Sequence, residues 1–453
     1  MTTTVAPEAA IPMSLEEHFS RNLIGGQWKF PAGPFEYEIR SPADSQVIAV
    51  VPLSSRFDVT DAVEAARTAL RGTWADREVR ARLLRRLLDQ LTANEQEIAR
   101  VQSAETGLTA EDSLTAVRLT LREARSQLRC EAMARAPKTG GVSGHILSWG
   151  LPFTEVVTSV FPALVRGDTV VIKPSLRAPL SAVVFGYLAT ETGLHPGVVN
   201  VVQGTGGDVG AELVSRPDLS GLYVRAGERT LQQAERAHAK TLVPLRTVRA
   251  GGNAVILGPG ALEHLDEITE FVSTMVRMNS AGGPFNVPMV VAHTSAADEV
   301  LGRVISTLST VTAAPLPTET LRASALAGIR SLLDAGAVRR LGGDVIPDDI
   351  PHRMGWRVPP TVLDLGNVGS AAAVAQQLGM PLGPVLGVVR FDATDELAHV
   401  SLSVRAKDGV AHVWGLDLAE IPKLPHRLVV TGSPALDYTE DMRISPSWTE
   451  HAQ

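Results

Sequence analysis

Short apolar runs and amphipathic segments alternate through the middle of the chain. Between residues 141 and 245, strand-like runs (HILSWG, TVVIKPS, VVNVVQG, LYVRAG) are separated by segments with helical spacing (SVFPALVRGD, LSAVVFGYLATETG, LQQAERAHAK). This alternation is typical of parallel strands joined by helices, so it predicts a doubly wound α/β domain. Ligands bind such sheets at the carboxyl ends of the strands.

A second α/β unit follows in residues 246–430. It opens with a strand-like AVIL run and a segment, ALEHLDEITEFVSTMVRM, whose apolar residues recur at helical spacing. The apolar run MVVA and the strand-like TVLDL come later. We therefore predict two domains, 21–245 and 246–430, preceded by a disordered leader, 1–20, and followed by a C-terminal tail, 431–453.

Helices dominate the segment that follows the first strands. Residues 21–52 are predicted to form short strands and turns, and VTDAVEAARTAL a helix with Thr60 or Asp61 as its N-cap. The amphipathic segment 77–91 carries arginines on one face. Because acidic residues follow at once, we interpret this face as solvated rather than as a nucleic-acid or membrane contact. A further helix is expected at about 110–135.

The composition is that of a two-domain globular protein. The chain has 453 residues, 44% of them hydrophobic, and its 42 basic and 49 acidic residues give a net charge of −7. This charge gives no general attraction to nucleic acid or anionic membranes. No apolar run approaches the roughly 20 residues of a membrane span, and the N-terminus lacks the basic and apolar regions of a signal peptide. We expect a cytoplasmic protein without nucleic-acid or membrane partners.

Cys130 is the only cysteine. A single cysteine excludes an internal disulfide and a metal site with several cysteine ligands, and we predict no metal site. Two interpretations remain: a displaced catalytic nucleophile, or a small buried hydrophobic residue at the end of a helix. We favour the second, because no recognisable catalytic loop surrounds this residue.

A series of short motifs connects the two predicted domains to a known family. The motifs are Ile24-Gly25-Gly26-Gln27-Trp28, Ala104-Glu105-Thr106-Gly107, Lys173-Pro174-Ser175, the glycine-rich turn Gly204–Gly210, the turn Gly251-Gly252 and the segment Met380-Pro381-Leu382-Gly383-Pro384-Val385. In this order and at about this spacing, they resemble the aldehyde dehydrogenase superfamily over roughly residues 20–430. The resemblance implies two doubly wound α/β domains with a cleft between them.

The oligomerisation elements of that family are shortened in this sequence. Family members carry a strand-forming insertion before the nucleotide domain, but few residues separate Cys130 from Gly141 here. The glycine-rich C-terminal tail of the family is also missing or strongly shortened. The resemblance therefore implies a monomer, or a dimer of a type that differs from the family's.

The positions that carry the chemistry of the family hold other residues. The general base of the Glu-x-Gly-Gly turn corresponds to Arg249, and the attacking cysteine to Pro284 or Phe285. The asparagine that stabilises the oxyanion corresponds to Gly150. Ser280 is an alternative nucleophile, but a weak candidate because no base is matched to it. The resemblance thus implies that no catalytic residue of the family is retained.

The cofactor site of the family is partly kept. The matching cofactor-binding residues are Trp149, Lys173, Ser175, Gly204 and Gly210. By contrast, Met380 replaces the glutamate that holds the nicotinamide ribose, and Tyr223-Val224-Arg225-Ala226 replaces the Phe-Thr-Gly-Ser end of a strand. Two interpretations stay open, a degraded NAD(P) site or residues that serve only the fold, and the cofactor stays undetermined.

Arg225 and Arg249 replace small or acidic residues near the family's cofactor and substrate channel. Because a guanidinium group forms bidentate pairs with carboxylates and phosphates, one interpretation is that both arginines bind an anionic ligand. The other interpretation is that each forms a structural ion pair with a nearby Asp or Glu.

Three functions remain open. The first is a non-redox role on this fold, as a repurposed enzyme or ligand-binding pseudoenzyme for a small anionic or aldehyde-derived metabolite of bacterial-type metabolism. The second is an NAD(P)-dependent aldehyde dehydrogenase with a displaced active site, and the third is a scaffold subunit for a partner enzyme. Because the catalytic positions have changed together, we favour the first.

Overall fold

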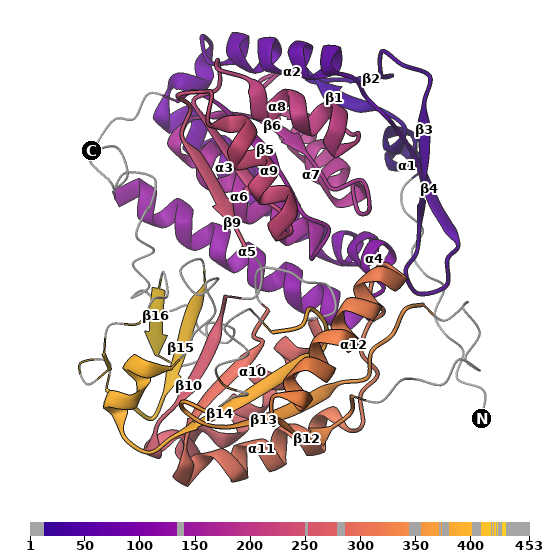
Figure 1. Cartoon of the computed structure of the whole chain (residues 1–453). Helices are drawn as coiled ribbons and strands as arrows, with labels where there is room; N and C mark the ends of the chain where they lie inside the picture. The colour runs from indigo at the N-terminus through magenta and orange to yellow at the C-terminus, as the bar shows by residue number, and fades with distance from the viewer. Residues whose placement is uncertain are drawn as a thin grey trace, which may run out of the picture.

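A computed structural model describes most of the chain as two lobes, each built on a central β-sheet (Figure 1). The described residues are 13–133, 140–249, 252–278, 286–343, 355–370, 373, 380–400, 409–417, 419, 421–422, 424 and 428–431. The first lobe ends with a strand that stops at Val248, and the second begins with a strand at Ala254. The domain boundary expected at 246 therefore falls inside the last strand of the first lobe.

The first lobe contains a sheet with the strand order β2-β1-β7-β6-β5-β8-β9. Its strands are β1 (Asn22–Ile24), β2 (Gln27–Lys29), β5 (Val142–Ile146), β6 (Thr169–Lys173), β7 (Val199–Val201), β8 (Gly221–Arg225) and β9 (Leu245–Val248). The strands from β7 to β9 in this order run parallel, whereas β1 joins β7 antiparallel. A separate hairpin pairs β3 (Glu36–Arg40) with β4 (Val47–Pro52).

The second lobe contains a sheet with the order β12-β13-β14-β11-β10-β15-β16. Its strands are β10 (Ala254–Leu257), β11 (Met289–His293), β12 (Val338–Leu341), β13 (Thr361–Asn367), β14 (Val385–Phe391), β15 (Val410–Trp414) and β16 (Leu428–Thr431). All neighbouring strands in it run parallel except β12, which pairs antiparallel with β13 at the sheet edge.

Helices cover the sheets. They are α1 (Met13–Phe19), α2 (Arg56–Ala69), α3 (Arg77–Ala93), α4 (Glu95–Thr106), α5 (Ala110–Met133), α6 (Pro152–Arg166), α7 (Leu180–Glu191), α8 (Ala211–Ser215), α9 (Glu228–His238), α10 (Leu265–Met278), α11 (Thr294–Leu308) and α12 (Glu319–Asp334). Successive residues of β6 belong to different cores: Val170 and Ile172 pack with α6 and α7, and Val171 packs with α2 and α9. Both faces of the first sheet are thus covered, which confirms the predicted doubly wound α/β fold.

Part of the expected disordered leader, 1–20, is helical. Residues 1–12 lie outside the described part of the chain, but α1 is a helix rather than a continuation of the leader. Leu15 and Phe19 are buried in the core of the first lobe. The burial of these two apolar side chains gives the segment the tertiary support that so short a helix needs.

The predicted N-cap of α2 is wrong. The helix begins at Arg56, four residues before Thr60, and its N-cap is Ser55. The Ser55 side chain accepts a hydrogen bond from the N–H of Phe57, while the Asp58 carboxylate accepts one from the Ser55 N–H at 2.8 Å. This reciprocal capping box satisfies N–H groups that Thr60, inside the first turns, could not reach.

The arginine face of α3 is only partly solvated. Arg77 and Arg85 are exposed, as expected, but Arg80 is buried. Its guanidinium donates to the carbonyl oxygens of Val165, at the end of α6, and Trp74. A cation at the carboxyl end of a helix is stabilised by the helix dipole, so Arg80 ties α3 to α6.

Helix α5 runs along the boundary between the lobes (Figure 1). Its residues Ala116 and Leu119 belong to the core of the second lobe, whereas Leu121 and Ala124 belong to a core of the first. An ion pair, Arg277 to Asp112 at 3.0 Å, joins α10 to the start of α5. One helix therefore contributes to the packing of both lobes.

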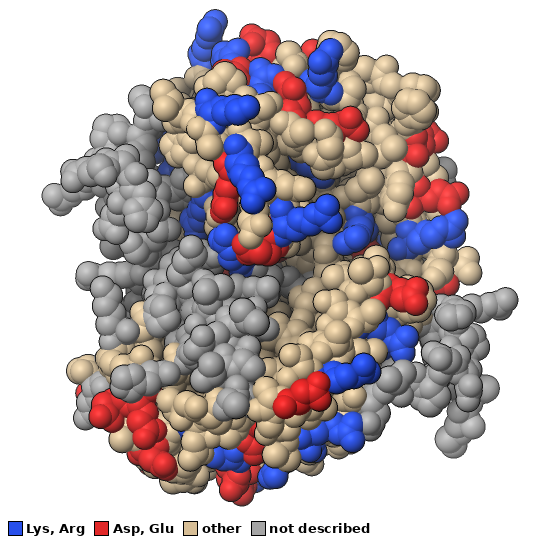
Figure 2. All heavy atoms as spheres, viewed as in Figure 1, with Lys and Arg blue, Asp and Glu red and all other residues tan. Residues whose placement is uncertain are grey.

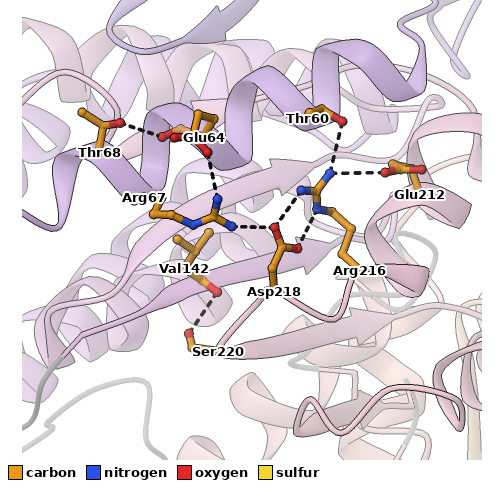
Figure 3. Close-up of polar contacts among 9 residues, drawn as sticks. All are labelled: Thr60, Glu64, Arg67, Thr68, Val142, Glu212, Arg216, Asp218 and Ser220. Carbon is orange, nitrogen blue, oxygen red and sulfur yellow. Dashed lines mark hydrogen bonds and ion pairs between the residues drawn. The ribbon is translucent and has the colours of Figure 1, made fainter.

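A network of charged side chains ties α2, α8 and the segment before β8 together (Figure 3). Asp218 accepts two hydrogen bonds of 2.8 Å from Arg216 and one of 2.5 Å from Arg67. Arg216 also contacts Thr60 and Glu212. The hydrogen bonds from Arg216, together with those from Arg67, lower the pKa of Asp218 to about 2. We call these residues the Asp218 network.

The surface carries charges of both signs. On the face shown in Figure 2, basic and acidic side chains are intermingled over both lobes. Among the described helices, none is long and apolar enough to cross a membrane. Within the same residues, no group of three or more His, Cys, Asp or Glu side chains is arranged to hold a metal ion.

Candidate functional site

The carboxyl ends of the parallel strands of the first sheet converge on one edge. Lys173 is the last residue of β6, Arg225 is the last residue of β8, and Arg249 follows β9. Trp149 and Gly150 lie in the turn between β5 and α6. The fold thus brings most of the predicted site residues of this lobe to the edge where parallel sheets bind ligands.

A buried ion pair joins Arg225 to a residue that the sequence did not single out. The Nε of Arg225 lies 2.7 Å from Oε1 of Glu155, in the first turn of α6. The two side chains are 7% and 1% exposed, so the pair is almost completely removed from water. Of the two interpretations of Arg225, the geometry thus shows the ion pair, and binding of an anionic ligand stays a prediction.

Glu155 is held by charge more than by hydrogen bonds. Neither of its carboxylate oxygens has a hydrogen-bond partner of good geometry among the described residues. Burial raises the pKa of Glu155 to about 7, and the positive charge of Arg225 opposes this rise. A carboxyl group that titrates near neutral pH can donate or accept a proton under ordinary conditions.

Two further polar side chains lie on the same face of the sheet as Arg225. Tyr223 precedes Arg225 by two residues on β8, and its ring lies 6.0 Å from that of His145 on β5. Burial raises the pKa of Tyr223, whereas burial lowers the pKa of His145 to about 3. Both side chains are therefore neutral at neutral pH, and Arg225 and Glu155 carry the local charge.

The turn that leads into α6 is conformationally unusual. Leu151 has φ of 48° and ψ of 63°, a left-handed conformation that non-glycine residues rarely adopt. Its side chain is buried in the core of the second lobe, and the following helix begins at Pro152. This tertiary packing holds the residue in a conformation that costs about 1 kcal/mol or more, and such strain concentrates at functional sites.

The residues matched to the nucleotide ribose lie next to each other. Lys173 is 5% exposed, and its Nζ donates to the carbonyl oxygen of Pro174 at 2.8 Å. Burial lowers the pKa of Lys173 to about 8. Its aliphatic stem packs against Gly210, at the end of the turn that starts with Gly204, and Ser175 begins the next turn. Whether these residues bind a cofactor stays a prediction.

Arg249 pairs with two carboxylates of α9. Its Nε lies 2.9 Å from Glu228 and its guanidinium 3.4 Å from Glu235. Glu228 is the first residue of the helix, so its carboxylate lies at the positive end of the helix dipole. Arg249, which the sequence matches to the family's general base, is therefore a cation that bridges two acids.

Several predicted positions fall outside the described residues or show no site. Ser280, Pro284 and Phe285 lie outside the described residues, so their roles remain predictions. Met380, at the position of the ribose-binding glutamate, is a buried core residue. Cys130 belongs to α5, three residues before its end at Met133.

Sequence reasoning missed Glu155. Glu155 is the only charged residue between the start of α6 and its last residue, Arg166, in a helix that is mostly apolar and buried. An acidic residue in such a segment is rarely left unpaired, and this was the available signal. Its partner could not be identified, because Arg225 lies 70 positions further along the chain.

Comparisons with known proteins agree with the fold. The model of the aldehyde dehydrogenase family matches residues 28–430. The chain is 27% identical to geranial dehydrogenase of Castellaniella defragrans over 84% of this chain and 83% of that protein. It is 29% identical to 2-hydroxymuconic semialdehyde dehydrogenase of Pseudomonas sp. (strain CF600) over 85% of this chain and 84% of that protein. The names of these relatives favour aldehyde oxidation over the non-redox role.

A solved structure gives the same assignment. Aldehyde dehydrogenase C of Pseudomonas syringae, determined as a mutant with NAD+ and octanal, superposes with a TM-score of 0.76 at 26% identity, covering 92% of this chain and 90% of that one. The match of the family model to nearly the whole length, together with this likeness in fold, confirms the predicted resemblance. The chain belongs to the aldehyde dehydrogenase family.

Proposed function

We propose that this family member binds a small anionic or aldehyde-derived metabolite at the end of β8 and does not oxidise aldehydes through a cysteine thiol. The buried pair of Arg225 and Glu155 carries this proposal. The pair supports the proposal because a guanidinium can bind an anionic ligand, and because burial raises the pKa of the Glu155 carboxyl group to about 7, at the edge of the sheet where ligands bind.

The cysteine content supports a non-redox role. Oxidation of an aldehyde through a covalent intermediate needs a thiolate next to the carbonyl carbon, because hydroxyl groups are far weaker nucleophiles at neutral pH. The single cysteine of the chain, Cys130, belongs to α5, which precedes the strands of the candidate site. Arg249, at the position of the family's base, stays protonated and cannot accept a proton.

The fit of a dinucleotide differs between the two ends of the site. Lys173 and the open turn around Gly206 suit a ribose, since no atom lies within 4 Å of a Cβ placed on Gly206. The start of α9 does not suit a pyrophosphate. There Glu228 already supplies a carboxylate to the helix N-terminus, and a second anion would be repelled by it.

A second candidate function is NAD(P)-dependent aldehyde oxidation. The names of the relatives favour it, since all those compared above are dehydrogenases. In this case Lys173, Ser175 and the Gly204–Gly210 turn would hold the nucleotide. Bound NAD(P) would accept a hydride from the aldehyde, and a nucleophile would have to come from a residue outside the family position.

Calorimetric titration with NAD+, NADP+, NADH and NADPH, followed by an aldehyde panel assayed for NAD(P)H formation, separates the two functions. The proposal expects no turnover with any aldehyde, in the wild type and in Cys130→Ala alike. Turnover that Cys130→Ala abolishes would establish a thiol dehydrogenase and sink the proposal. Turnover that survives in this variant would leave the exclusion of a thiol standing, but it would overturn the non-redox role and point to another nucleophile.

A further inference from the structure

The carboxylate of Glu155 already pairs with the Nε edge of the Arg225 guanidinium. The two groups are 2.7 Å apart, and a guanidinium group pairs with a ligand carboxylate as it pairs with a glutamate. An external anion that pairs with this edge of Arg225 requires Glu155 to withdraw or lose its charge. Two carboxylates that share one guanidinium in a buried space repel each other.

We propose that Glu155 is a built-in counterion of Arg225, and that a small monocarboxylate takes its place on the guanidinium while Glu155 takes up one proton. The exchange balances: one ligand carboxylate and one proton enter, the Glu155–Arg225 ion pair breaks, and a ligand–Arg225 ion pair forms. The net charge of the site is unchanged. This inference rests on the proposed function and adds to it a ligand class and a dependence on pH.

The packing of Glu155 supports the exchange. Both of its oxygens lack a hydrogen-bond donor of good geometry among the described residues, so no backbone or hydroxyl group fixes the ionised form. By comparison, the buried Glu105 accepts hydrogen bonds from the N–H groups of Leu180 and Ser181 and from the Ser181 hydroxyl. Glu105 therefore serves the start of α7, whereas among the described residues the partner of the Glu155 carboxylate is Arg225.

The site lies close to the surface. After Arg225 the chain reaches the half-buried Ala226 and the exposed Gly227. A Cβ placed on Gly227 would meet no atom within 4 Å, so open space begins two residues along the chain from Arg225. A small ligand therefore has a short way to travel, and a monocarboxylate matches the single charge that it replaces.

The side chains near Glu155 keep their protonation states near neutral pH, whereas the carboxyl group of Glu155 can change its own. On β5, burial holds the pKa of His145 at about 3, so this ring stays neutral. On β8, burial raises the pKa of Tyr223, and on β9 the guanidinium of Arg246 lies 6.0 Å from the Tyr223 ring and stays charged. Arg225 is the charged group that acts on Glu155, and burial raises the Glu155 pKa to about 7.

The test is calorimetric titration of the full chain with sodium acetate and sodium benzoate between about pH 6 and pH 8, in two buffers of different ionisation enthalpy. Both ligands stay ionised throughout, so any pH dependence belongs to the protein. We expect the affinity of the wild type to fall about fivefold from pH 7 to pH 8, with about one proton taken up per carboxylate bound near pH 8. In Glu155→Gln the affinity should be independent of pH and about tenfold higher than that of the wild type at pH 8.

Three variants complete the design. Glu105→Gln is the matched control, a buried carboxyl group away from Arg225, and should keep the wild-type pH dependence. Arg225→Met should abolish binding. If the methionine variant does not fold, Arg225→Lys replaces it, because it keeps the positive charge. It should weaken binding, since lysine lacks the bidentate geometry. A pH-independent affinity in the wild type, or an unchanged pH dependence in Glu155→Gln, would overturn the exchange.

Two other outcomes separate this inference from the proposed function. If neither carboxylate binds the wild type at pH 6, the exchange is wrong, while the absence of aldehyde turnover would still support a non-redox role. If carboxylates bind with proton uptake but aldehydes are oxidised, the exchange stands and the proposed function falls.

Discussion

Two carboxylate–guanidinium sites in the same lobe differ in almost every physical respect. Asp218 lies at the surface, accepts three hydrogen bonds from two arginines, and has its pKa lowered to about 2. Glu155 lies in the interior, has one ionic contact, and has its pKa raised to about 7. The same pair of chemical groups thus gives opposite shifts, because hydrogen bonding dominates at one site and loss of hydration at the other.

The difference separates a stabilising site from one that is costly to build. Asp218 joins α2, α8 and the start of β8 while its charge stays partly hydrated (Figure 3). The Glu155–Arg225 pair removes two charges from water, and a buried pair of this kind is weak grounds for stability. A costly arrangement at a ligand-binding edge of a sheet is more consistent with a functional role.

The largest effect is expected for Arg225→Met. Removing the cation leaves Glu155 buried without a counterion, so the variant should lose about 3–5 kcal/mol of unfolding free energy near pH 8. Because the pKa of Glu155 is raised in the folded protein, the native state keeps a proton above pH 4.5 that the unfolded chain releases. The stability of the protein therefore falls as the pH rises from 4.5 towards about 7. Urea unfolding should therefore show a smaller loss near pH 5.5, and equal losses at both values would contradict the buried-charge account.

A smaller effect is expected for Glu105→Ala. This glutamate is as buried as Glu155 but is bonded to neutral donors, two N–H groups and one hydroxyl at the start of α7. Leaving these donors without an acceptor should cost about 2–3 kcal/mol in urea unfolding. Hydrogen exchange at Leu180 and Ser181 should quicken, whereas unchanged exchange rates would show that water or another group replaces the carboxylate.

Asp218→Asn should cost about 1–2 kcal/mol near pH 7, since the group is partly exposed and screened. Because the folded pKa of Asp218 is lowered to about 2 from 3.8, its contribution is present above 3.8 and is lost as the pH falls through about 2. At 1 M NaCl, the difference in unfolding free energy between Asp218→Asn and the wild type should be roughly halved. The Arg225→Met difference should change little with salt, and a similar salt response in both variants would remove the distinction between the two sites.

The smallest effect on stability is expected for Arg249→Ala, whose partners Glu228 and Glu235 are both partly exposed. We expect a loss below about 1 kcal/mol in thermal unfolding. The same variant tests the anion hypothesis for Arg249. An unchanged affinity for acetate and benzoate would show that this arginine is structural, while Arg225 remains the binding residue.

The sequence predicted the sheet of the first lobe because its strands are continuous apolar runs, a pattern that is local to each strand. It did not predict the N-cap of α2, although Ser55 and Asp58 have the spacing of a capping box. The helical spacing of apolar residues can be recognised only further along the helix. Local pattern also failed at Arg80, whose acceptor at Val165 lies 85 positions away.

The candidate site was predictable only in part, for the same reason. Arg225 stood out from the family resemblance, since an arginine is unusual at that strand end. Glu155 did not, because its meaning depends on a contact between α6 and β8 that no local pattern encodes. Burial of both groups, which decides the pKa of the carboxyl group, becomes visible only when the helix is packed on the sheet.

The position of α5 has a consequence for how the chain folds. Ala116 and Leu119 complete the core of one lobe, and Leu121 and Ala124 complete that of the other. Loss of this helix would open two hydrophobic cores at once, so neither half can melt while the other stays intact. The protein should behave as a single cooperative foldon, and a fragment cut between Val248 and Ala254 would be an aggregation-prone species rather than an independent domain.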